Sequence, residues 1–553
     1  MVKNCFCRSK FFNLFSLRMT KSTLRPELQD FFSALEIGEL QEKEEREAKN
    51  KLHVSEFVGF AAFAYEKLRN LVDYKDDVLL RKNAIKRLLR QRNVFGQVVK
   101  EQTVAEDLLR ELVLSRYLPN DAVPLKKIDD VAAIIVKYRA LQTELRQQGA
   151  FNPYIKKWLL GLEAMEIEYM LVIDPLPRAL TLYAYRLLRP VFRQALRQVS
   201  DKDYNTQLVI TLQRLLAKAD GDILAYHLFK HQYPDWFSGK FVNYAAIAQT
   251  LASSHNDQDR YLASRLGRRM QLLIGRKLIP FVILRVMLRE HGLAKVRGFI
   301  NQVGEMVRFS EAAYKKHYNE IRSRIRRKGF HAMMYILITK MALAIMVELP
   351  YERWVLGYIN YTALAINLVL PPLLMLFITI LITPAAKKNL DKLRQSMKEI
   401  VYGVDEPVWL KPPLAKRLAP RFWTRLLFGF LTTATFVASF GFIIYGLREL
   451  EFNFLSGALF IFFVSLVSFF GMSLRQQANS LKVIPPTGNI FTFILDVISL
   501  PMVWLGRWLS NTFDKINVFV LFLDFFVELP LKVLLKFLDK WFSFLREKKE
   551  EMF

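Results

Sequence analysis

Two histidines one helical turn apart are the first residues whose types and spacing could do chemistry. His227 and His231 lie in the run DILAYHLFKHQYPDW, where Asp222 and Asp235 could add carboxylate oxygens. Imidazoles at i and i+4 share one face of a helix and can ligate a metal ion together. The glutamate that acts as the base in a His-Glu-x-x-His helix is absent, because Leu228 follows His227. A metal site is therefore one interpretation, and histidines that only line a helix end are the other.

A lysine inside an apolar segment is the second candidate. Lys340 lies in YILITKMALA, and a charged side chain at the centre of a membrane helix costs about 2.5–3.5 kcal/mol on insertion scales. Such a side chain usually faces a bundle interior, a water-filled cavity or an acidic partner, and the alternative is that it reaches the headgroups along its own helix. Among membrane-buried polar residues we expect Asp496 to be its partner, then Asn367, with Asn360 and Glu348 as further candidates.

A polybasic cluster directly precedes this apolar segment. It consists of Arg322, Arg324, Arg326, Arg327 and Lys328. Lys and Arg resist translocation and are attracted to anionic lipid, so the cluster predicts contact with anionic headgroups or with a partner protein. It also places residues 1–329 in the cytoplasm and most of the remaining chain in the membrane.

The charge distribution agrees with this division of the chain. Residues 1–330 contain 57 Lys and Arg against 36 Asp and Glu, and residues 331–553 contain 23 against 16. A second basic cluster within 76–92 lacks interleaved aromatic residues for base stacking, so we disfavour nucleic acid and favour lipid headgroups there if this helix lies near the bilayer. That second cluster comprises Arg81, Lys82, Lys86, Arg87, Arg90 and Arg92.

Motifs for common cofactors and nucleophiles are missing from the sequence. It has no glycine-rich phosphate loop and no Gly-x-Ser-x-Gly turn, and both of its cysteines, Cys5 and Cys7, precede residue 10. These features favour a protein that is not an enzyme, and we expect no cofactor.

Hydrophobic patterning predicts an all-α chain with four parts. Residues 1–18 are interpreted as a start-site extension, because Met19 opens a more ordinary polar start, and residues 19–329 as a basic, all-helical cytoplasmic domain. Residues 330–475 are expected to form a polytopic membrane domain of four transmembrane helices. These spans are Phe330–Glu348, Gly357–Thr383, Leu426–Tyr445 and Phe452–Met472.

The C-terminal part, residues 476–553, is expected to hold membrane-embedded or interfacial helices. The segment 490–509 is long enough to span but contains Asp496, Pro501 and Arg507. The segment Ile516–Leu545 has charged residues at four-residue spacing, which favours a helix lying along the membrane. The connector Lys387–Arg425 carries ten Lys or Arg, so we expect it and both termini to be cytoplasmic.

Several short runs resemble an uncharacterised multipass membrane protein family of reduced-genome candidate-phyla bacteria. They include Val347-Glu-Leu-Pro350, Gly357-Tyr-Ile-Asn-Tyr361, the stretch from Lys515 to Val520, and the run that begins at Trp541. The resemblance implies a bacterial inner (plasma) membrane and no particular reaction.

Three hypotheses for function remain. The first is a membrane scaffold or anchor whose helical domain binds a cytoplasmic or membrane partner. The second is a transporter or channel component that uses Lys340 and the polar region 490–530. The third is a membrane-bound metal-dependent enzyme that uses His227 and His231. The identity of the protein partner and the oligomeric state are left open.

Overall fold

The computed structural model describes residues 24–48, 50–54, 77–94, 100–237, 243–381, 388–403, 409, 422–479, 490–515 and 541. These residues form an all-helical structure in which the sole β-type pairing is an isolated bridge between Lys51 and Pro124. Four of the described helices are long and apolar enough to cross a membrane. The all-α prediction is therefore confirmed for the described residues.

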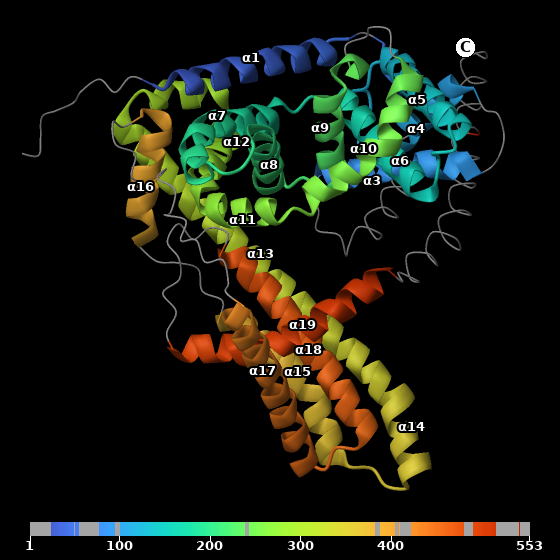
Figure 1. Ribbon diagram of the computed structural model, residues 1–553, viewed down its shortest axis with the longest axis vertical. Coiled ribbons are helices and arrows are strands. Elements are labelled where there is room, and N and C mark those ends of the chain that lie inside the picture. The colour runs from blue at the N-terminus through green and yellow to red at the C-terminus, as the bar shows by residue number, and fades with distance from the viewer. Residues whose placement is uncertain are drawn as a thin grey trace, which may run out of the picture.

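Eleven of the described α-helices precede the first candidate span and form a broad body (Figure 1). They are α1 (Pro26–Arg46), α3 (Asp77–Val94), α4 (Glu101–Leu114), α5 (Lys126–Gln147), α6 (Pro153–Leu171), α7 (Pro175–Ala195), α8 (Asp201–Leu216), α9 (Gly221–Gln232), α10 (Tyr244–Leu262), α11 (Arg265–Ile274) and α12 (Ile279–Ile300). Short 3₁₀ turns at Pro234–Phe237 and Gly275–Leu278 complete it.

Side-chain oxygens cap the N-termini of several of these helices. Asn152, Ser200 and Asp220 each accept a hydrogen bond from the backbone N–H three residues later, at the starts of α6, α8 and α9. Such N-caps satisfy backbone donors that have no partner inside the helix.

The body contains two hydrophobic cores. Helices α3, α4, α5, α6, α9 and α10 enclose one of them, around Tyr138, Leu162 and Trp236. The other lies between α1, α7, α8, α11 and α12 and includes Phe32, Tyr183 and Phe281. The apolar run 270–288, which also contains Arg276, Lys277 and Arg285, contributes Met270, Phe281 and Met287 to this second core.

Helix α13 (Val303–Leu343) joins the body to the membrane-type helices without a break. Its first turns contribute Met306 and Tyr314 to the body core, whereas Ile325 and Ile336 pack among the later helices. Two π-helical segments at Ala344–Glu348 and Glu352–Leu356 flank the short α14 (Leu349–Tyr351) and extend the helical path. Gly357 ends it with a φ of 77°, a left-handed conformation that glycine adopts without a steric penalty.

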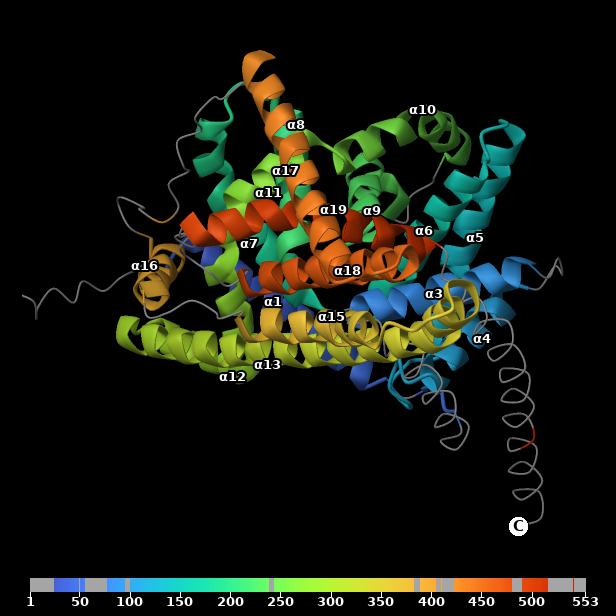
Figure 2. The same cartoon turned by 90° about the horizontal axis from the view of Figure 1, so that it is seen from below.

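The helices that leave the body form a stem. Besides α13 and α14 it comprises α15 (Tyr361–Leu381), α17 (Phe422–Glu449), α18 (Phe454–Asn479) and α19 (Ile490–Lys515). Figure 1 shows that α13, α15, α17 and α18 run away from the body, whereas α19 lies crosswise to the long axis of the molecule. Figure 2, seen along that axis, shows α19 extended across the view. Close approach is built in where α19 crosses α18, because a Cβ on Gly506 would lie 2.0 Å from the Ser465 carbonyl oxygen.

The connector between the second and third candidate spans returns to the body. Its helix α16 (Lys388–Val401) places Leu393, Met397, Ile400 and Val401 in the second core. The Tyr183 hydroxyl donates to the Ile400 carbonyl, and the Arg25 backbone N–H donates to the Val401 carbonyl at 3.0 Å. The body and this connector therefore lie on the same side of the stem.

Candidate functional site

One cluster of polar groups buried in the stem joins the helical path of α13 to α15 and α18. Lys340 lies on α13, Glu348 and Glu352 lie on the two π-helical segments that follow it, and Asn367 lies on α15. The start of α18 adds Ser456. Each of these five side chains is at most 1% exposed. The π-helical segments matter for this geometry because they change the angular spacing along the helix, and such segments are frequent at functional sites.

Lys340 and Glu348 are joined through one amide. The Lys340 ammonium donates to the Asn367 side-chain oxygen, and the Asn367 amide nitrogen donates to Glu348 Oε1. The Lys340 Nζ also lies 4.6 Å from the centre of the Phe463 ring, within the range of a cation–π contact. An ammonium and a carboxylate thus share a bridging group that can donate and accept at once.

A second set of contacts continues this network toward the far end of the stem. Glu352 Oε1 accepts from Asn453 Nδ2 at 2.7 Å and lies 3.4 Å from the Ser456 hydroxyl. Its other oxygen accepts from the Asn360 backbone N–H at 3.3 Å. Asn453 also accepts from the Ser456 N–H at 2.8 Å, which caps α18. The network therefore fastens α15 and α18 to the helical path that begins with α13.

Chemically, this network contains two buried carboxylates and one ammonium. In the interior of a protein such charges are tolerated when each has hydrogen-bonded partners of good geometry. These contacts give each charged or amide side chain a hydrogen-bonded partner in another segment: Lys340, Asn367, Glu348 and Glu352. The arrangement can hold the helices in register, and a change of protonation within it would weaken that hold.

One of the partners expected for Lys340 is in contact with it. The contact with Asn367, the second choice, is present, whereas the Asp496 side chain lies outside the described residues. Asn360 caps the start of α15 by accepting from the Ala363 N–H at 3.0 Å, and it does not contact Lys340. Snorkelling is not observed, because Lys340 is only 1% exposed.

The polybasic cluster lies on α13 where that helix leaves the body. Arg322, Arg324, Arg326 and Arg327 are exposed, and Lys328 is partly buried, with its Nζ 3.4 Å from Gln477 Oε1 on α18. Next to the cluster, an open hollow of about 630 Å³ is lined by Lys316, Asn319, Glu320, Ser323, Arg324 and Arg327. Four exposed guanidinium groups at this point could bind phosphate groups in two-point contacts.

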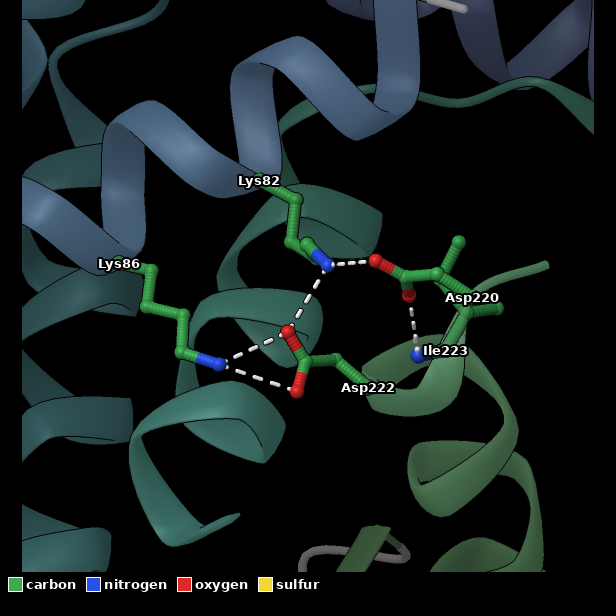
Figure 3. Close-up of polar contacts among 5 residues, drawn as sticks. All are labelled: Lys82, Lys86, Asp220, Asp222 and Ile223. Atoms are coloured by element: carbon green, nitrogen blue, oxygen red, sulfur yellow. Dashed lines mark hydrogen bonds and ion pairs between the residues drawn. The ribbon is translucent and has the colours of Figure 1, made fainter. Parts of the chain in front are cut away.

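The second basic cluster, on α3, differs from the expectation of a lipid-facing surface. Figure 3 shows Lys82 and Lys86 reaching the two aspartates at the start of α9. The Lys82 ammonium contacts Asp220 and lies 2.8 Å from Asp222, and Lys86 Nζ is also 2.8 Å from Asp222. Lys82 is 1% exposed. The expectation of headgroup contact is therefore wrong for these residues, because tertiary packing pairs them with internal carboxylates.

The other members of that cluster follow the same trend in part. Arg81 binds Glu168 at 3.0 Å and Arg87 is buried, whereas Arg90 is exposed and the Arg92 side chain lies outside the described residues. Burial of Asp222 would raise its pKa, but the ammonium groups of Lys82 and Lys86 lower it overall. Gly161 leaves room for the ion pairs, since a Cβ there would lie 2.5 Å from Asp222 Oδ1.

The two candidate metal-binding histidines, His227 and His231, differ in burial and in contacts. His227 Nε2 lies 3.1 Å from the Tyr169 hydroxyl, and His231 is exposed at the end of α9. Burial, together with the charges of Lys230 and Arg178, lowers the pKa of His227 to about 4. In the described part of the chain, no group of three or more His, Cys, Asp or Glu residues could hold a metal ion. The metal hypothesis gains no support from these positions.

The sequence reasoning missed Glu352, Asn453 and Ser456 in the stem. Two signals could have indicated them: the Glu348–Glu352 spacing of four residues, and an Asn three residues before a Ser at the start of an apolar run. The C-terminal segment Ile516–Leu545 lies almost entirely outside the described residues, which include Trp541 alone from it.

Comparison of the chain with family models, with curated proteins and with solved structures finds no match.

Proposed function

We propose that the protein is a multipass membrane protein that acts as a scaffold, with its stem in the bilayer and its body in the cytoplasm as the binding platform. Four helices of the stem have the length and composition of membrane spans. The polybasic cluster at the start of the first span favours a cytoplasmic body. In a bacterium the membrane would be the inner membrane.

The observation that carries the scaffold proposal is the double attachment of the body to the stem. Helix α13 runs from the body core into the stem as one 41-residue helix. Separately, α16 returns from the second span and packs into the same core. Two independent connections hold the body at a fixed distance and orientation relative to the bilayer, which a binding platform needs and a flexible linker would not provide.

The surface turned away from the stem suits a protein partner. Helix α1 lies on that side (Figure 1). Its exposed face presents Ile37 and Leu40, which are 58% and 62% exposed, among glutamates that include Glu39 and Glu44. An acidic face with apolar residues would be repelled by anionic lipid and would favour a basic, partly apolar protein surface.

Orientation is tested by cysteine labelling in cells, after Cys5 and Cys7 have been replaced by serine. Lys398 on α16 and Tyr358 at the far end of the stem are both exposed. We expect Lys398→Cys to react with an impermeant maleimide only after lysis and Tyr358→Cys to react in intact cells. The reverse pattern would invert the topology.

The scaffold role is tested by photo-crosslinking in living cells from position 37, with position 442 as the control. Phe442 is 78% exposed on α17 and should face lipid. A defined protein adduct from position 37 that position 442 lacks, and that Leu40→Glu removes, is the expected result. If both positions give the same adducts or none, the platform proposal is wrong.

A transporter or channel component is the second candidate, favoured by the buried Lys340–Asn367–Glu348 contacts. Charged residues inside membrane bundles commonly mark ion or substrate pathways. Flux of a labelled solute through proteoliposomes of the wild type, lost in Lys340→Met protein that is still folded, would favour this candidate over the scaffold.

A further inference from the structure

One face of α11 is basic over its whole length. Arg265, Arg268 and Arg269 are exposed, and Arg276 in the following 3₁₀ turn is exposed on the same side. Leu272 lies between them and is 83% exposed. The opposite face, formed by Gly267, Met270 and Ile274, is buried against the body. Helix α11 and the following turn therefore present four guanidinium groups around one projecting apolar side chain.

The basic face lies close to the junction of body and stem. Figure 1 shows α11 along the side of the body from which α13 descends. Lys218, just after α8, is close enough to Lys328 for their charges to interact, and Lys328 is two residues before the expected first span, Phe330–Glu348. Because this underside of the body is adjacent to the start of a span, a bilayer around the stem would lie opposite α11.

We propose that α11 is a membrane-contact helix whose arginines bind the phosphate groups of anionic phospholipids while Leu272 enters the headgroup layer. The proposal rests on the proposed insertion of the stem. Guanidinium groups bind phosphate in two-point contacts, and a leucine among cations is typical of helices that lie on anionic membranes. The contact would give the body a third attachment, this one sensitive to lipid composition.

Charge complementarity sets the expected strength. A basic residue close to an anionic bilayer contributes about 1 kcal/mol, which corresponds to about a fivefold change in the ratio of docked to undocked states. Removing two arginines should therefore lower that ratio about twenty-five-fold. The attraction decays over about 8 Å at physiological ionic strength, so the contact should also weaken in high salt.

The test uses the full chain in proteoliposomes, with Cys5 and Cys7 replaced by serine and one fluorophore attached at Leu272→Cys. Lipids spin-labelled at the headgroup quench a fluorophore that reaches the bilayer surface. We expect strong quenching in vesicles that contain phosphatidylglycerol, and much less in pure phosphatidylcholine or in about 1 M salt. The same label at Ile37→Cys, on the opposite side of the body, should stay unquenched.

Paired variants supply the matched control. Arg268→Gln with Arg269→Gln should strongly reduce the quenching at position 272, whereas Lys43→Gln with Arg46→Gln on α1 should leave it unchanged. Equal quenching in both lipids, or no loss in the α11 pair, would overturn the proposal. A change in the fluorescence of the label when single-stranded RNA is added, with no quenching by lipid, would overturn the proposal in favour of an acidic macromolecule.

A label at Phe442→Cys separates this proposal from the insertion of the stem. Acyl-chain quenchers should quench it if the stem is inserted. If they do so while position 272 stays unquenched, the lipid contact of α11 alone fails. If position 442 is not quenched, the proposed insertion fails, and the α11 proposal fails with it.

Discussion

Lys340 on α13 donates a hydrogen bond to Asn367 on α15, and both side chains are sealed inside the stem. Because Asn367 in turn donates to Glu348, the amide links an ammonium to a carboxylate on the same helical path. Neither charge has to face lipid, so the cost of placing a lysine in an apolar helix is offset within the bundle.

Removing this lysine should destabilise the stem. Lys340→Met leaves Glu348 buried without its cation, and we expect a loss of about 3–5 kcal/mol in the free energy of unfolding in detergent. The double variant with Glu348→Gln should recover at least half of that loss, because no stranded charge remains. Ile338→Ala, on the exposed face of the same helix, is the control. Additive losses in the double variant would contradict the bridged arrangement.

Enlarging Gly506 should displace α19 from α18. A Cβ at this position would lie 2.0 Å from the Ser465 carbonyl oxygen, whereas at Gly446 on α17 nothing lies within 4 Å. The measurement is disulfide formation between Ser465→Cys and Met502→Cys. In the native protein the Ser465 Oγ and the Met502 Sδ are 3.4 Å apart. We expect Gly506→Ala to slow this crosslink strongly and Gly446→Ala to leave it unchanged. Equal rates in both variants would contradict the crossing.

The ion-pair cluster between α3 and α9 should stabilise the body. Lys82→Met removes a buried cation from Asp220 and Asp222, and we expect it to cost about 3–5 kcal/mol, measured by thermal or denaturant unfolding of the full chain. Arg90→Met, an exposed position on the same helix, should cost less than about 0.5 kcal/mol. Similar losses at both positions would argue against the internal cluster.

Helix α6 should become less stable as the pH rises. Burial, with a further contribution from Glu166 and against the opposing charge of Arg139, raises the pKa of Glu163 to about 8. The folded state therefore holds this proton more tightly than the unfolded chain, whose carboxyl has a pKa near 4.5. The stabilisation is complete below pH 4.5 and is lost progressively up to about pH 8.

Hydrogen exchange of α6 amides, corrected for intrinsic rates, measures this dependence. Protection should fall between pH 5 and pH 8 in the wild type and fall less steeply in Glu163→Gln, where Glu168 of the same helix, whose pKa burial raises to about 7, still titrates. Glu39→Gln, at an exposed position of α1, should retain the wild-type slope. If the slope in Glu163→Gln equals that of the wild type, Glu163 does not cause the pH dependence.

The sequence by itself determined the helical class, the four apolar segments and their separation from a basic, mostly polar part. These properties follow from hydrophobicity and charge along the chain, which need no knowledge of neighbours in space. Lys340 could likewise be singled out, because a charge inside an apolar run is costly wherever the helix packs.

Tertiary structure alone decided which groups meet. Asn367 rather than Asn360 reaches Lys340, because the π-helical segments and the turn at Gly357 set the register between α13 and α15. The lysines of α3 look like a solvated basic face in the sequence, yet they pair with Asp220 and Asp222, about 140 residues away. Contacts between distant segments depend on helix crossing and rotation, and periodicity within one helix carries no information about either.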